Sequence, residues 1–100
     1  MSIITPAWDY AVISATGNVR TTPGLLGGIF VSAASSTPTI TIYDDAATGT
    51  SVPLVTVFTP VAGTYYTLPF KFYNGLYIVI SGTVSATVGY LRGGFPFNIG

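Results

Sequence analysis

The sequence predicts an all-β protein, a two-sheet antiparallel β-sandwich of about eight short strands. No stretch shows the 3.6-residue apolar period of a helix, whereas two-residue alternation recurs along the chain. The alternating segments are rich in Val, Ile, Thr, Tyr and Phe, which are enriched in strands. Turn signals recur about every 8 to 12 residues, a spacing typical of sandwiches and Greek-key barrels.

The first two strands are expected at 8–15 and 25–33. The turn Thr16-Gly17-Asn18 ends the first, and Pro23-Gly24 precedes the second. Within the second strand, the Gly27-Gly28 pair predicts a bulge or a close approach of another backbone.

The next two strands are expected at 39–44 and 52–59. The first has the cleanest alternation, with Ile40 and Ile42 on one face and Thr and Tyr residues on the other. One of its faces should therefore belong to the core. The strand at 52–59 carries apolar residues on both faces, which predicts burial on both sides.

A strand at 64–72 follows, in which Pro69 requires an edge position or a bulge. Asn74-Gly75 is the strongest hairpin signal in the chain, because a type I′ turn needs positive φ at both central residues. Ser81-Gly82 predicts a second tight turn, which joins a strand at 76–80 to a last strand at 83–91. In that last strand alternate residues are apolar, namely Val84, Ala86, Val88 and Tyr90.

Charge is scarce, at 6% of the residues against about 25% in typical proteins. The folded surface of a chain of this mass is roughly 5,400 Å². Because 49% of the residues are hydrophobic, we expect this surface both to use neutral polar groups and to be partly covered by neighbouring subunits. Three basic residues are too few for nucleic-acid binding. No apolar run approaches the length of a transmembrane helix, and the first residues lack the pattern of a secretory signal.

The chain is equally poor in catalytic and metal-binding side chains. It has no His, Cys or Glu, so no Ser or Thr has the partner that a nucleophile needs. We interpret Asp44-Asp45 as a solvated turn, because adjacent strand residues point to opposite sides and calcium needs more carboxylates. The glycine pairs lack the context of a phosphate loop. We expect no enzyme activity, no cofactor and no metal.

Aromatic residues make up 14% of the chain and allow one binding alternative, a glycan-binding module. Tyrosine rings on a sheet can stack on sugar rings, but Tyr is also enriched in cores and protein interfaces. The candidates for stacking are Tyr43, Tyr65, Tyr66, Tyr73 and Tyr77.

The two ends differ from the middle, and we divide the chain into an N-terminal arm at 1–7, a sandwich domain at 8–92 and an apolar tail at 93–100. Flanking segments are usually polar, so apolar ones are best explained by docking on a neighbouring subunit; the alternative is that they fold back over their own domain. Phe95, Phe97 and Ile99 could add a strand to the open sheet edge of a neighbour. The expected subunit or capsid contacts are Ile3, Ile4, Trp8, Phe95, Phe97 and Ile99.

Three motifs, TITIYD at 39–44, TPVAGTYYTL at 59–68 and NGLYIVISG at 74–82, carry a resemblance to small virion proteins of tailed bacteriophages. The similar region, 23–91, is about two thirds of the chain. The resemblance implies a jelly-roll-like decoration (cement) protein that is assembled in the host cytoplasm. It would sit on the capsid exterior as a homotrimer and clamp the major capsid protein. Similar proteins also occur in tails, necks and fibres, so these locations remain alternatives.

Overall fold

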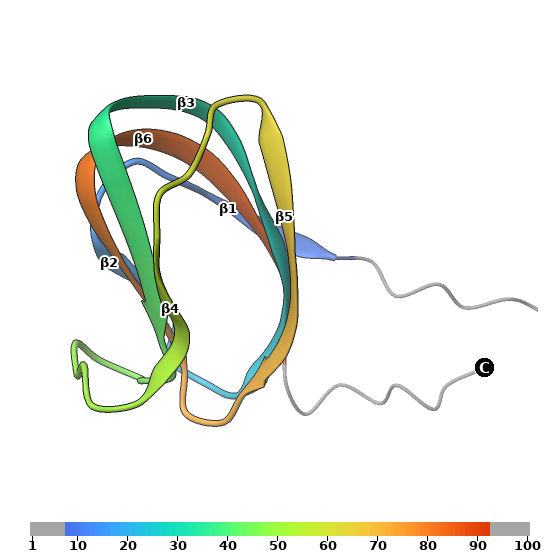
Figure 1. The fold of residues 1–100 in the computed structure, drawn as a ribbon. Coiled ribbons are helices and arrows are strands. Elements are labelled where there is room, and N and C mark those ends of the chain that lie inside the picture. The colour runs from blue at the N-terminus through green and yellow to red at the C-terminus, as the bar shows by residue number, and fades with distance from the viewer. Residues whose placement is uncertain (1–7, 93–100) are drawn as a thin grey trace, which may run out of the picture.

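The computed structural model describes residues 8–92, which form six strands and no helix (Figure 1). All strand pairs are antiparallel, which confirms the predicted all-β class. The strands belong to one curled sheet and are fewer than the eight expected, because two of them are long. They are β1 (Asp9–Ile13), β2 (Gly17–Arg20), β3 (Gly24–Tyr43), β4 (Pro53–Phe58), β5 (Thr64–Phe72) and β6 (Leu76–Arg92).

The long strands β3 and β6 contain 20 and 17 residues and pair with each other over their whole lengths. Both bend at the same place, where residues 36–38 of β3 lie opposite Gly82 of β6. Thr37 and Gly82 have left-handed backbones there, with φ of 48° and 86°. The predicted tight turn at Ser81-Gly82 is therefore wrong, because the chain bends at Gly82 and continues in the same strand.

The bend divides the sheet into two arms that share β3 and β6. In the first arm, β1 pairs with the second half of β6, and β5 pairs with the first half of β3. In the second arm, β2 pairs with the first half of β6, and β4 pairs with the second half of β3. Figure 1 shows how the sheet curls so that the inner faces of the two arms face each other.

One hydrophobic core lies between the arms. Ile40 and Ile42 are fully buried in it, as the alternation predicted, and the alternate apolar residues of 84–90 are also buried. The expectation that both faces of the strand at 52–59 would be buried is wrong at Val57, which is 61% exposed. The buried core residues are Leu26, Ile29, Val31, Ile40, Ile42, Phe72, Leu76, Ile78, Val84, Ala86 and Val88.

The predicted hairpin at Asn74-Gly75 is wrong. The strand before it, β5, pairs with β3 and not with β6, so the chain crosses here from the first arm to the second. Neither residue has the positive φ of a type I′ turn, which among residues 8–92 occurs at Thr37, Gly63 and Gly82. A Cβ on Gly75 would come within 2.6 Å of the Arg20 carbonyl oxygen, so the glycine is needed for close packing.

Two other predictions on special residues are confirmed. The register of β3 shifts between Leu26 and Gly28 against both neighbouring strands, which is the bulge expected at Gly27-Gly28. Pro69 lies in β5, which pairs on one side only and is an edge strand.

Candidate functional site

The outward side of the first arm, hereafter the outer face, carries two rows of residues in register across all four strands. Ile29 and Val88 form an inward pair and are buried, so the neighbouring pairs on these strands point outward. One row consists of Val12, Thr87, Phe30 and Tyr65. The other consists of Tyr10, Gly89, Gly28 and Thr67.

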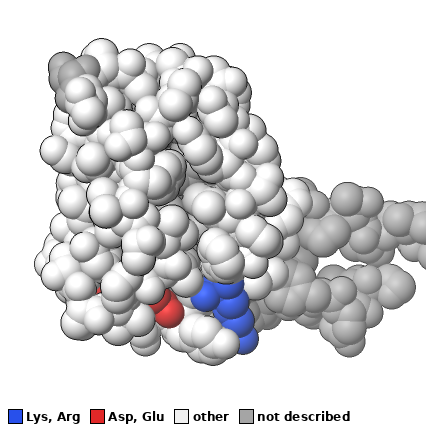
Figure 2. All heavy atoms as spheres, in the orientation of Figure 1, with Lys and Arg blue, Asp and Glu red and all other residues white. Residues whose placement is uncertain are grey.

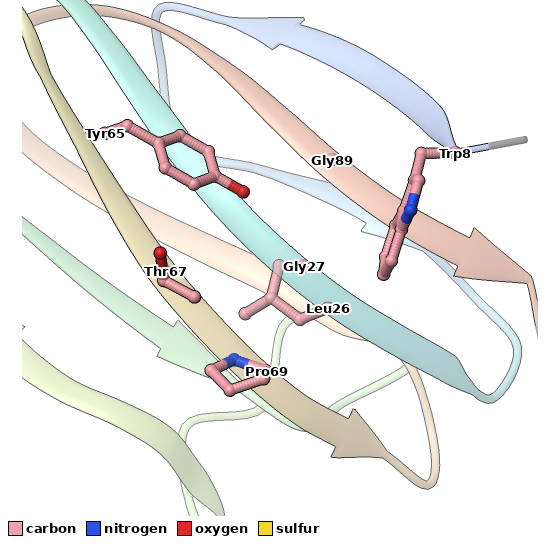
Figure 3. A pocket seen from close by; sticks show the side chains of 7 residues that line it. All are labelled: Trp8, Leu26, Gly27, Tyr65, Thr67, Pro69 and Gly89. Atoms are coloured by element: carbon pink, nitrogen blue, oxygen red, sulfur yellow. The ribbon is translucent and has the colours of Figure 1, made fainter.

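A groove lies in this face where Gly27 and Gly89 provide no side chains. It has a volume of about 390 Å³, with Gly27 and Gly89 in its floor. Figure 3 shows Trp8 on one side of this glycine floor and Tyr65, Thr67 and Pro69 along β5 on the other. The residues that line the groove are Trp8, Leu26, Gly27, Tyr65, Thr67, Pro69 and Gly89.

The aromatic walls lie directly on glycines. A Cβ on Gly27 would come within 2.7 Å of the Trp8 ring, and a Cβ on Gly28 would come within 2.5 Å of the Tyr65 hydroxyl oxygen. Larger residues at these two positions would displace the rings. Gly89 differs, because no heavy atom lies within 4 Å of its Cβ position, so a side chain there would project into open space.

The outer face is apolar and exposed to solvent. Trp8 is 52% exposed and Tyr65 58%, and Tyr10, Val12 and Phe30 are exposed as well. The residues that line the groove carry no charge, and their polar side-chain groups are the Tyr65 and Thr67 hydroxyls and the Trp8 indole N–H. A contiguous apolar surface of this kind marks a site for a protein partner or another ligand.

The charged groups lie mainly elsewhere. Figure 2 shows a visible face that is almost entirely uncharged, with charged side chains gathered near its lower end. Two cations lie over aromatic rings: Arg20 is 5.5 Å from the ring centre of Tyr90, and Lys71 is 4.8 Å from that of Tyr73. Lys71 lies in β5 of the first arm, but neither cation is among the residues that line the groove.

The interpretation of Asp44 as part of a solvated turn is wrong, because the residue is only 5% exposed. Its carboxylate accepts hydrogen bonds from the backbone N–H groups of Tyr73 (2.8 Å), Asn74 (2.7 Å) and Gly75 (3.3 Å). These are the residues that cross from β5 to β6. Asp44 therefore holds the crossing that replaces the predicted hairpin.

Asp45 has a separate role in the loop that follows β3. Its carboxylate accepts hydrogen bonds from the N–H groups of Gly49 and Ala47, both at 2.8 Å, and these bonds lower the pKa of Asp45 below its usual value. The side-chain amide of Asn18 donates to the carbonyl oxygens of Asp45 (3.1 Å) and Ala47 (2.8 Å) and ties this loop to β2. The two aspartates thus shape two different backbone segments.

The tyrosines considered for sugar stacking are not brought together. Tyr43 and Tyr77 form a pair in the second arm, with ring centres 6.1 Å apart. Tyr66 packs against Phe58 at 5.1 Å and contributes to the edge of the core. Of the five candidates, Tyr65 is the one that lines the groove.

The expected contact residues are divided by the structure. Trp8 lies in the wall of the groove, whereas Ile3, Ile4, Phe95, Phe97 and Ile99 lie outside the described residues. Sequence reasoning missed the groove itself, although the Gly27-Gly28 pair was recognised as a bulge. The missing signal was that Gly89 lies beside Gly27, and only the strand register, in which Gly89 is opposite Gly28, reveals this.

Comparison with protein-family models, with characterised proteins and with solved structures found no match for this chain. Residues 8–92 include no helix of the length and apolar character needed to cross a membrane. The same part of the chain has no group of three or more His, Cys, Asp or Glu side chains placed to hold a metal ion.

Proposed function

We propose that the protein is a non-enzymatic structural protein of a bacteriophage virion. In this proposal it is a capsid decoration (cement) subunit that forms a homotrimer and clamps the major capsid protein from the capsid exterior. The arms then correspond to the two sheets of a jelly-roll-like β-sandwich. The shared core between their inner faces supports this description of the fold.

The observation that carries the proposal is the apolar outer face of the first arm, with its uncharged groove. Val12 is 69% exposed in β1, and two exposed aromatic side chains, Trp8 and Tyr65, line the groove on the same face. Such a surface favours association, and a formal net charge of zero provides no repulsion between copies. A subunit whose surface becomes covered by neighbours has these properties.

Stabilisation of the shell follows from mass action. A subunit that binds the assembled capsid but not its separated proteins favours the assembled state by about 2.7 kcal/mol per site, when its free concentration is 100-fold above Kd. Because the residues that line the groove are uncharged, binding through the groove should depend little on ionic strength. Weak dependence on ionic strength suits a clamp that must hold under changing salt conditions.

The test is binding to purified phage capsids by the wild-type chain, Val12→Asp and Val57→Asp. The two valines are matched, since both are exposed in edge strands, but Val12 lies on the outer face and Val57 in β4 of the second arm. We expect Val12→Asp to lose binding and Val57→Asp to retain it. Equal binding by both variants would remove the outer face from the proposal.

Copy number in purified particles decides the location. A number comparable with that of the main shell protein supports a capsid subunit, whereas a handful of copies would support a tail, neck or fibre subunit. Absence of the protein from particles would contradict a virion role altogether.

The groove favours one second candidate, a glycan-binding module, because Trp8 and Tyr65 expose aromatic surface beside hydroxyl groups. Trp8 is the only tryptophan of the chain, so its fluorescence reports on the groove. Titration with host polysaccharides should leave this signal unchanged for a capsid subunit. A saturable change would favour the glycan module.

A further inference from the structure

We propose that the groove of the outer face binds the segment 93–100 from a second copy of this chain. In this arrangement Phe95, Phe97 and Ile99 lie between the Trp8 and Tyr65 walls. The inference concerns how copies join one another, so it goes beyond a role on the capsid and holds wherever the assembly acts.

The chemistry of the segment matches that of the groove. Its sequence, Gly-Gly-Phe-Pro-Phe-Asn-Ile-Gly, contains no charged side chain, and the groove is lined by aromatic, aliphatic and glycine residues. Burial of aromatic and aliphatic side chains against Trp8 and Tyr65 removes apolar area from water and is therefore favourable. The glycine floor lets a bound chain approach the sheet closely.

The lengths also match. The β5 wall contains Tyr65, Thr67 and Pro69, which span four residue steps, or about 13 Å at 3.3 Å per residue. In an extended segment Phe95, Phe97 and Ile99 span the same four steps and point to the same side. Pro96 lacks a backbone N–H, which matters little on the face of a sheet because no ladder partner exists there.

A second copy is the better source of the segment because of where the described chain ends. Gly89, in the floor, lies three residues before Arg92, and between them β6 passes Leu26 and the Trp8 end of the groove, so residue 93 begins beyond that end. A segment returning to its own outer face must first rise by a layer spacing of about 10 Å, which takes about three extended residues. Phe95 would be used in that rise, whereas a segment from another copy can place all three apolar side chains in the groove.

The size of the outer face supports an exchanged segment over a flat contact. Four strands about 4.8 Å apart and about five residues long cover roughly 300 Å² in projection. Specific interfaces bury about 800 Å² on each partner. A segment that leaves one copy beside its own groove and enters the groove of another adds the missing area. A ring or two-fold pair of such exchanges is closed, as homo-oligomers usually are.

The test uses the full chain and two variants that remove opposite halves of the contact. Gly89→Phe fills the groove from its floor, where the structure has open space for a side chain. The second variant replaces Phe95, Phe97 and Ile99 by Ser and leaves the groove intact. Gly17→Phe is the matched control, because Gly17 lies in the second arm and also has no heavy atom within 4 Å of its Cβ position.

Sedimentation equilibrium measures association, and Trp8 emission reports burial of the groove wall. We expect both groove and segment variants to weaken association about tenfold or more, with Gly17→Phe equal to wild type. An equimolar mixture of Gly89→Phe with the triple Ser variant should associate again, because it restores one intact segment and one intact groove. Far-UV circular dichroism checks that each variant is folded.

Three outcomes overturn the inference. A wild-type chain that stays monomeric at all concentrations excludes exchange. Unchanged association of the triple Ser variant, whose substitutions lie outside residues 8–92, shows that another surface joins the copies. If, at a dilution where both proteins are monomeric, Trp8 emission differs between the triple Ser variant and wild type, then each chain fills its own groove. None of these outcomes bears on whether the protein is found in virions.

Discussion

Replacing Asp44 by asparagine tests whether one buried carboxylate holds the crossing between the two arms. The carboxylate accepts three backbone hydrogen bonds, from Tyr73, Asn74 and Gly75. The amide oxygen of the introduced side chain can accept on one side, but its NH2 group then faces a backbone N–H on the other. One buried N–H loses its partner, at a cost of about 1–3 kcal/mol, and the remaining bonds fall from charged to neutral strength.

The expected loss for Asp44→Asn is thus about 3–4 kcal/mol, a large share of the roughly 5–15 kcal/mol that stabilises a typical domain. Urea unfolding at fixed protein concentration, followed by circular dichroism, measures it. Asp45→Asn is the control, because Asp45 binds two N–H groups of its own loop and should matter much less. If the two variants were equally stable, the role assigned to Asp44 would be refuted.

Three further predictions concern the backbone and the groove. Gly82→Ala should destabilise by about 1–3 kcal/mol in thermal unfolding, because Gly82 has a φ of 86° and its Cβ would come within 2.8 Å of the Pro38 Cα; a Tm equal to wild type would contradict this. The pKa of Asp45, measured by NMR titration, should lie below 3.8. Because the pKa is lower in the folded state, Asp45 stabilises the fold above pH 3.8, and this contribution is lost as the pH falls through the folded-state pKa. Gly27→Ala should move the Trp8 ring and shift its emission, and an unchanged spectrum would show that the ring does not rest on this glycine.

Alternation predicted the core well because it depends only on the two-residue period of a strand. Ile40 and Ile42 are buried as expected, and the strand at 64–72 has the predicted bounds. The resemblance to phage virion proteins, with the location and trimeric state it implies, stays a prediction.

Turn signals were less informative, because they indicate local backbone conformations and not which strand the following segment pairs with. Ser81-Gly82 supplies the positive φ of a bend inside β6 as readily as that of a hairpin. At Asn74-Gly75 the N–H groups are satisfied by Asp44, about thirty residues earlier, and no local pattern predicts that partner. The groove depends in the same way on Gly27 of β3 lying beside Gly89 of β6.

The two long strands have a consequence for how the molecule comes apart. Because β3 and β6 each run through both arms, neither arm contains a complete set of strands of its own. Loss of β1 or β4 leaves the β3–β6 pairing intact, whereas separation of β3 from β6 unfolds both arms at once. Resistance to heat or to mechanical force should accordingly be concentrated in that one ladder, and melting should occur as one transition.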